Sequence, residues 1–270
     1  MYTAKIGYQG GGLPLDLNYP GRYEVLDITG LDTGVINIST FNIAGADGSV
    51  YSSAKIPNRN IVITVKILGD VPTRRRALYM NLPLKKPVTF YFKNEIRDVK
   101  IDGYVENISC PQFTDSEIMQ ISLICPNPAF IDATGTSLQF TTSTLHLSYL
   151  KPSVGMKIQI EALAGFTTFG IQNTATGEEL SFTAVGAAPG NAFIATDLIT
   201  VDTRKGQKSV TLTRYVDNVG DVNIMSGLDI DSDFLQINEG VNDFAYKIDG
   251  AVDTTKAKVT LIYADEYEGT

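Results

Sequence analysis

The chain has 270 residues, of which 43% are hydrophobic and 19% are charged, and its formal net charge is -8. This composition is sufficient to bury cores and is not typical of a disordered chain. The acidic balance argues against general affinity for DNA or RNA, which depends on clustered Lys and Arg. No apolar run approaches the length that spans a membrane.

Turn-forming and β-branched residues dominate the composition. The chain contains 24 glycines and 11 prolines, together with many Thr, Val, Ile and Tyr residues. This mixture favours short strands separated by turns. The length is enough for two domains of ordinary size. We therefore expect a mainly all-β chain with two β-sandwich-like domains.

The first half of the chain contains a series of strand patterns. Ile61, Ile63 and Val65 alternate with smaller or polar residues, which is typical of a strand with one face in a core. Residues 42–50 are expected to form a loop, with Asp47-Gly48 as its turn dipeptide. The strands expected in this half cover residues 23–28, 35–39, 60–69, 88–93, 99–105 and 119–125.

One short helix is expected over about residues 72–81. Asp70 stands just before Pro72, and proline suits the first turn of a helix. Leu78 and Leu82 lie four residues apart and therefore fall on one face, which we expect to pack on the sheet. Pro83 ends the segment.

The strand over 119–125 ends abruptly at Cys125-Pro126-Asn127-Pro128. Each proline lacks an N–H donor and moves the preceding residue out of the helical region, so strand pairing should stop there. We expect this rigid exit to end an N-terminal domain of residues 1–132. The Thr- and Ser-rich residues 133–153 are expected to form a connector with room for a strand around 145–149.

The remaining residues, 154–270, again show strand patterns. A turn at Thr176-Gly177 predicts a hairpin, and Gly206 lies in a second turn over 204–208, where glycine adopts a positive φ at little cost. Regular short strands with turns favour a sandwich. The strands expected here cover residues 156–160, 170–173, 180–184, 198–203, 209–214 and 257–263.

The sequence contains few residues that could carry catalysis. Its single histidine, His146, lies between leucines and is expected to be a surface or hydrogen-bonded residue. Cys110 and Cys125 are expected to be free, half-buried thiols, and a Cys/His metal site needs more ligands than these. We therefore predict no catalytic residue, no cofactor and no metal ligand.

Two other motifs resemble known sites only in part. Asp229-Ile-Asp-Ser-Asp233 begins like a calcium loop, but Phe234 replaces the glycine and Gly240 replaces the bidentate acid. A solvated turn is expected there, although a weak ion site of another kind stays open. The glycine run 10–12 lacks a following Gly-Lys-Ser/Thr, so we interpret it as a flexible N-terminal arm and not as a phosphate loop.

The strongest local charge cluster is Arg74-Arg75-Arg76, which lies on the expected helix. Successive helical residues point about 100° apart, so the three side chains cannot all face one partner. Two interpretations stay open: a solvated helix face, or one or two arginines that pair with acids of a neighbouring copy. Arg74, Arg75 and Arg76 are therefore the candidate interface residues.

Several segments, taken in order, resemble the distal tail proteins of long-tailed bacteriophages. The resemblance covers about residues 22–269. The segments that carry it are Tyr23-Glu-Val-Leu-Asp-Ile-Thr-Gly-Leu31, Asp47-Gly48, Arg59 before the following strand, the arginine-bearing helix, Ile101-Asp-Gly-Tyr104, Ser122-Leu-Ile-Cys-Pro-Asn-Pro-Ala-Phe130, Ile199-Thr-Val-Asp202 with Arg204, Asp233-Phe-Leu-Gln-Ile-Asn-Glu-Gly-Val-Asn242 and Val259-Thr-Leu-Ile-Tyr263.

This resemblance implies a structural adaptor of the virion tail tip, made in the host bacterial cytoplasm. Its N-terminal domains would form a homo-oligomeric, usually hexameric ring, and its C-terminal domains would resemble galectin or carbohydrate-binding sandwiches. The implied partners are the tail tube protein, a tail-associated hub or lysin, and receptor-binding proteins or host glycan. Some family members carry a long arm or a carbohydrate-binding insertion in the C-terminal half, for which this chain has no room.

Three alternatives to the adaptor stay open. The chain could be a carbohydrate-binding module that recognises host cell-wall glycans through tyrosines. It could be a glycoside hydrolase or esterase, because any two carboxylates can meet in a fold, although the chain has no tryptophan for sugar stacking. It could also be a tube or baseplate component of a contractile tail or a tail-derived particle.

Overall fold

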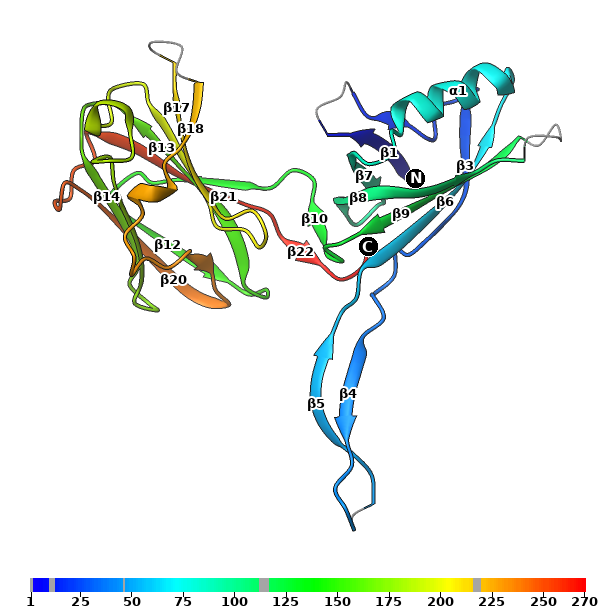
Figure 1. Ribbon diagram of the computed structural model, residues 1–270, viewed down its shortest axis with the longest axis horizontal. Helices are drawn as coiled ribbons and strands as arrows, with labels where there is room; N and C mark the ends of the chain where they lie inside the picture. Colours follow the sequence, from blue (N-terminus) through cyan, green and yellow to red (C-terminus); the bar gives the residue numbers. More distant parts are fainter. Residues whose placement is uncertain (1, 10–12, 46, 112–116, 216–219) are drawn as a thin grey trace. The chain divides into compact units, whose positions relative to one another are not determined.

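The computed structural model describes residues 2–9, 13–45, 47–111, 117–215 and 220–270. It is 53% strand and 7% helix, which confirms the predicted all-β class. The chain divides into two compact units, which we call unit 1, residues 1–134 with 266–270, and unit 2, residues 135–265 (Figure 1). The glycine run 10–12 lies outside the described residues.

The segment that we expected to be a connector, 133–153, belongs largely to unit 2. Strand β11 (Thr136–Gln139) pairs with β21 (Ala257–Tyr263), and β12 (Thr144–Tyr149) pairs with β20 (Gly240–Ile248). Thr136, Ser137, Thr144 and Ser148 are therefore strand residues at the edges of two sheets. The strand expected around 145–149 is confirmed as β12, whereas β11 was not predicted, because edge strands expose most of their side chains.

The last five residues were expected in the C-terminal domain but lie in unit 1. There β22 (Glu266–Tyr267) pairs with β10 (Phe130–Asp132), which in turn pairs with β8. Unit 2 is therefore an insertion into unit 1 and is joined to it by two chain segments. This long-range pairing has no local sequence signature.

Unit 1 is built on one antiparallel sheet with the strand order β2-β1-β7-β8-β9-β6-β3. The predicted strands of this half are confirmed, whereas β1 and β2 were not predicted. On β6, Ile61, Ile63, Val65 and Ile67 are all fully buried, as their alternation indicated. The strands are β1 (Thr3–Tyr8), β2 (Leu15–Asp16), β3 (Tyr23–Thr29), β6 (Arg59–Ile67), β7 (Pro87–Lys93), β8 (Asp98–Ser109) and β9 (Ile118–Cys125).

Helix α1 (Val71–Asn81) confirms the expected helix to within one residue. The Asp70 carboxylate accepts a hydrogen bond from the Thr73 N–H at 3.3 Å and so caps the N-terminus. Leu78 and Leu82 are buried in the core of unit 1, as their spacing predicted.

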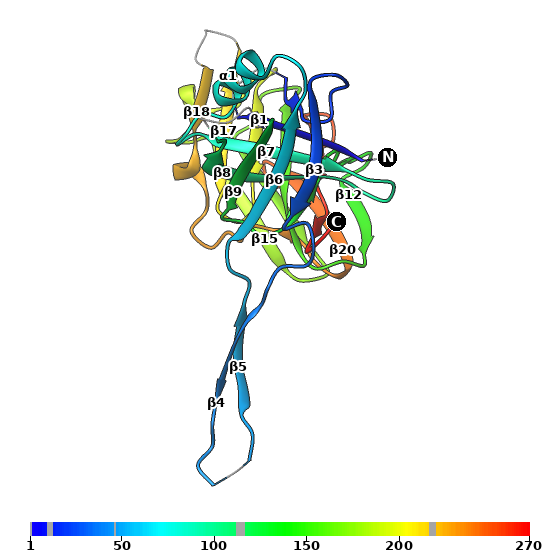
Figure 2. The same cartoon turned by 90° about the vertical axis from the view of Figure 1, so that its right-hand side faces the viewer.

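A separate two-stranded hairpin, β4 (Asn37–Phe41) and β5 (Val50–Lys55), projects from the sheet of unit 1 (Figure 2). We call residues 33–58, which contain it, the arm. The strand at 35–39 was predicted, but the second strand was not, because Ser52-Ser53-Ala54 shows no apolar alternation.

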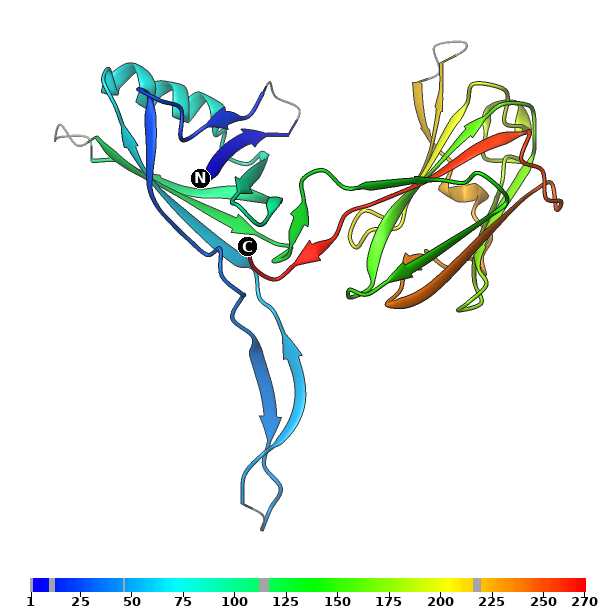
Figure 3. The ribbon, with the colours of Figure 1, turned by 180° about the vertical axis from the view of Figure 1, so that it is seen from behind.

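Unit 2 is a sandwich of two antiparallel sheets, with the orders β11-β21-β13-β16-β17-β18 and β12-β20-β14-β15 (Figure 3). The predicted hairpin is confirmed as β14 and β15, whereas β20 was not predicted. Ile158, Phe169, Phe244 and Leu261 lie in its core. The remaining strands are β13 (Val154–Ala162), β14 (Thr168–Asn173), β15 (Glu178–Thr183), β16 (Leu198–Asp202), β17 (Ser209–Arg214), β18 (Gly220–Asn223) and β19 (Gln236–Ile237).

Candidate assembly and binding surfaces

The arm exposes apolar side chains along its whole length. Val35 is 77% exposed, Ile38 is 64% exposed and Tyr51 is 62% exposed. The charged residues of the arm are Asp47 and Lys55 alone. Such a surface is unusual for a segment that contacts only water. Its exposed large apolar residues are Val35, Ile36, Ile38, Phe41, Ile43, Val50, Tyr51 and Ile56.

Both faces of the arm are apolar. Ile38 pairs with Ala54, and Phe41 pairs with Val50. Val50 and Tyr51 are consecutive residues of β5 and therefore point to opposite faces, because side chains alternate along a strand. An isolated hairpin is only marginally stable in water, and its outer edges are open to further strand pairing. The arm therefore has the properties of a segment that is covered by another chain.

A buried arginine fixes the base of the arm. Arg59 is 6% exposed, and its guanidinium donates hydrogen bonds to the carbonyls of Gly30 at 2.8 Å, Asp32 at 2.5 Å and Pro128 at 2.6 Å. It also donates to the Glu268 carbonyl. One side chain thus holds together the start of the arm, the double-proline exit and the C-terminal tail.

Two glycines allow this packing. Gly30 has φ +87°, and a Cβ there would lie 2.1 Å from the Asn60 carbonyl oxygen. Gly269 packs so closely on the start of the arm that a Cβ would lie 2.9 Å from the Thr33 nitrogen. Any other residue at Gly30 would have to move the turn from β3 into the arm.

Cys125, next to Arg59, is fully buried, and Cys110 is half-buried; both are free thiols. Burial raises the pKa of the Cys125 thiol to about 12, although the nearby Arg59 charge acts in the opposite direction. A thiol in this state does not form the nucleophilic thiolate at neutral pH. Cys125 is therefore a core residue of the sheet.

The three candidate interface arginines differ in their surroundings. Arg74 is half-buried, and its guanidinium donates to the Gly21 carbonyl within the same unit. Arg75 is also half-buried, whereas Arg76 is exposed. A pairing with a neighbouring copy stays a prediction, and Arg76 is the best placed of the three for it.

His146 and the acidic motif of unit 2 lie at the surface. The His146 Nδ1 is 2.5 Å from the Asp243 carboxylate; the His146 side chain is largely exposed and that of Asp243 is partly exposed. The backbone of the 229–233 segment follows β15: the Asp229 N–H donates to the Ser181 carbonyl and the Asp233 N–H to the Glu179 carbonyl. Within the described ranges, no group of three or more His, Cys, Asp or Glu residues is placed to bind a metal ion.

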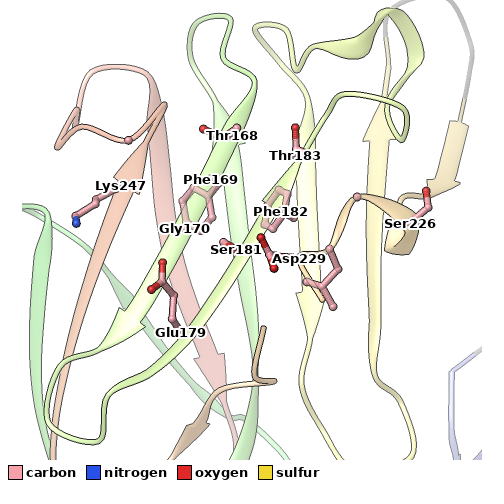
Figure 4. A pocket seen from close by; sticks show the side chains of 13 residues that line it. Thr168, Phe169, Gly170, Glu179, Ser181, Phe182, Thr183, Ser226, Asp229 and Lys247 are labelled. Atoms are coloured by element: carbon pink, nitrogen blue, oxygen red, sulfur yellow. The ribbon is translucent and has the colours of Figure 1, made fainter. Parts of the chain in front are cut away.

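A pocket of about 340 Å³ opens on the outer face of the β12-β20-β14-β15 sheet of unit 2 (Figure 4). Gly170 of β14 forms its floor, between Ser181 of β15 and Lys247 of β20. Asp229 and Glu179 also line it. None of these residues was singled out as a site from the sequence, because strand pairing brings them together from three distant segments.

The fold is shared with proteins of phage hubs and baseplates. It matches the crystal structure of the SPP1 Dit protein with a TM-score of 0.68 and 16% identity, over 97% of this chain and 99% of the other. The SPP1 protein is described as a paradigm of the hub adsorption apparatus in phages that infect Gram-positive bacteria. Two structures of the phage p2 baseplate in its activated conformation, one with Ca and one with Sr, match with TM-scores of 0.63 and 0.62, each at 11% identity and with full coverage of both chains. No protein-family model and no curated protein matches the sequence. Among the described residues, no helix is long and apolar enough to cross a membrane.

Proposed function

We propose that this chain is a distal tail protein, a non-enzymatic adaptor that forms a homo-oligomeric, hexameric ring at the tip of a phage tail. The observation that carries the proposal is the arm. It is apolar on both faces, it has few charges, and both of its edges are open. The likeness to hub and baseplate proteins over nearly the whole chain supports the same assignment.

A neighbouring copy is the partner that we propose for the arm. In a closed ring each copy can give one arm and receive another, so every arm is covered and no free edge is left. The tail tube protein would bind on one side of the ring and a hub or lysin on the other. The place of action would be the virion tail tip, after assembly in the host cytoplasm.

Shortening the arm tests this proposal. Residues 38–54 are replaced by Asn-Gly, a two-residue turn that can close the remaining Asn37–Lys55 pair. We expect the purified full chain to form an oligomer and the shortened chain to be a monomer with an unchanged folded core. The mass is measured by light scattering and the fold by circular dichroism.

A matched control separates the arm from general surface hydrophobicity. Ile38→Ser removes an exposed apolar side chain from the arm, and Ile230→Ser removes one from unit 2, where Ile230 is 96% exposed. Only the arm variant should weaken the oligomer. An oligomer of unchanged mass after the arm is shortened would refute the proposal.

A further inference from the structure

A short segment that follows unit 2, residues 266–270, lies against the base of the arm (Figure 1). Its strand β22 pairs with β10, and its Tyr267 packs against the core of unit 1. Beyond Tyr267 the segment runs along the start of the arm, where the Thr270 N–H donates to the Leu31 carbonyl at 3.1 Å. We call residues 266–270 the strap.

Two arginines from different parts of unit 1 hold the strap in place. The Arg59 guanidinium donates to the Glu268 carbonyl, and the Arg97 guanidinium donates to the Gly269 carbonyl. Arg97 lies in the turn between β7 and β8, and its guanidinium carbon is 4.4 Å from the centroid of the Tyr267 ring. Both hydrogen bonds go to backbone carbonyls, so together they fix the path of the strap and not only one of its side chains.

The arm is joined to the sheet of unit 1 by two irregular connections. Residues 30–36 and 56–58 belong to no strand or helix. Short segments of this kind absorb the changes in φ and ψ when one part of a protein swings against another. The strap packs directly on the first of them, because a Cβ at Gly269 would lie 2.9 Å from the Thr33 nitrogen. The docked strap therefore restricts the hinge of the arm.

Unit 2 lies between the arm and the strap in the chain, so the strap is synthesised after it. In folded unit 2 the pairing of Thr136 with Tyr263 holds the two ends of the unit together. If unit 2 is unfolded, it becomes one long flexible loop between β10 and the strap. Loop closure then lowers the local concentration of the strap at the arm by roughly 10²-fold.

We propose that the strap is a conformational latch for assembly. Its docking fixes the arm in the direction in which the arm binds a neighbouring copy, so that a chain enters the ring after its unit 2 has folded. An arm that is already fixed loses less conformational entropy when it binds. The part that concerns the ring rests on the proposed function, whereas the restriction of the arm by the strap does not.

Time-resolved fluorescence anisotropy on the full chain tests whether the strap restricts the arm. A dye is attached to Ser52→Cys, at an exposed position of β5, in a Cys110→Ser background. The fast phase of the decay reports the swing of the arm, and the slow phase shows whether the labelled chain is a monomer. Variants are compared at nanomolar concentrations at which all of them are monomers, so the ring does not affect the result.

Arg97→Met releases the strap without changing the arm, because the Arg97 guanidinium binds the strap. Lys93→Met is the matched control, since Lys93 belongs to the same hairpin but forms an exposed ion pair with Asp98. We expect Arg97→Met to raise the amplitude of the arm motion roughly twofold, as for a change from rigid to flexible backbone, and Lys93→Met to leave it unchanged.

Gly269→Val tests the same contact from the side of the strap. The added side chain would displace the strap from the start of the arm. Glu268→Val is its control, because the Glu268 side chain is exposed and its backbone carbonyl still accepts from Arg59. In light scattering, Gly269→Val and Arg97→Met should raise the dissociation constant of the oligomer by about tenfold, and neither control should change it.

The order of folding is tested on the wild-type chain. After dilution from urea, pulsed hydrogen exchange reports when each strand becomes protected. We expect the amides of β22 to be protected together with those of β21 in unit 2, or after them.

Three results would overturn the proposal. The first is equal arm motion in the wild type and in both strap variants, if thermal melting shows that the variants are folded. The second is protection of β22 before β21. The third is increased arm motion in a strap variant whose oligomer is as stable as that of the wild type. A wild-type chain that forms no oligomer would refute the adaptor function, and the anisotropy would still decide whether the strap restricts the arm.

Discussion

At the residue scale, Arg59 connects segments that lie far apart in the chain. Its guanidinium binds carbonyls at the start of the arm, at the double-proline exit and in the C-terminal tail. It also stacks on the Phe130 ring, with 4.7 Å from the guanidinium carbon to the ring centroid. The direction in which the arm leaves unit 1 therefore depends on a residue outside the hairpin.

Replacement of this side chain should be costly. Arg59→Met keeps much of the apolar volume but leaves buried carbonyls without a donor, so we expect the free energy of unfolding to fall by about 2–4 kcal/mol. Urea denaturation measures the change. Arg76→Met, at an exposed position of α1, is the control and should change stability by about 0.5 kcal/mol or less. Equal losses in the two variants would contradict this role of Arg59.

The pocket shows what the sequence could and could not predict at this scale. The sequence places Gly170 within the expected hairpin, and a glycine inside a strand can indicate a point where a ligand or another backbone approaches closely. Its neighbours Lys247 and Asp229 were not predictable, because the register of β14 with β20 and β15 is set by side-chain packing across the sheet. The interface arginines could be named from the sequence, but only the structure shows that Arg74 is used within its own unit.

At the scale of elements, local patterns predicted β6 and α1 well. Strand β6 has a strong period of alternating Ile and Val, and α1 has a clear start at Asp70 with Pro72. Strand β20 was missed because its alternation is broken by Asn242. This residue is fully buried and accepts a hydrogen bond from the Asn173 amide at 3.1 Å. A polar residue satisfied by a distant partner cannot be recognised as a core residue from local sequence.

The turn that follows β20 carries a pH-dependent contribution to stability. The Asp249 carboxylate accepts hydrogen bonds from the N–H groups of Thr167 and Thr168 and from the Lys256 ammonium. Burial acts to raise the pKa of Asp249, but these hydrogen bonds, that of Lys256 foremost, outweigh it and hold the pKa well below its usual value. A depressed pKa stabilises the folded state above the unfolded pKa of about 4, and this stabilisation is lost as the pH falls towards the folded pKa.

Asp249→Asn should therefore destabilise the protein at neutral pH. We expect a loss of about 1–2 kcal/mol, because the group is partly exposed and solvent screens the ion pair. The difference from the wild type should narrow as the pH falls below about 4, because the Asp249 carboxylate of the unfolded chain binds a proton there while that of the folded chain stays ionised. Urea unfolding at both pH values measures it, with Asp231→Asn as the control. A difference that does not change with pH would contradict this account of Asp249.

At the scale of the whole molecule, unit 2 is an insertion into unit 1 and is joined to it by two segments. Strand β22 returns to pair with β10, and its tail is held by Arg59. The fold and its likeness to hub and baseplate proteins extend over both units.

The arm is the feature that links this fold to assembly. Its apolar surface on both faces and its open edges are difficult to reconcile with a chain that works alone. The sequence indicated only one of its two strands, because serine-rich β5 has no periodic apolar pattern. The structure shows that β4 and β5 pair as one hairpin. Removal of this hairpin therefore tests the proposed ring.

Electron microscopy of the purified full-length protein, beside the arm-shortened variant, tests the ring most directly. The account predicts closed rings with a central hole for the full-length chain and single particles for the variant. Full-length chains that stay monomeric at high concentration, even with the tail tube protein present, would contradict it, as would rings formed without the arm.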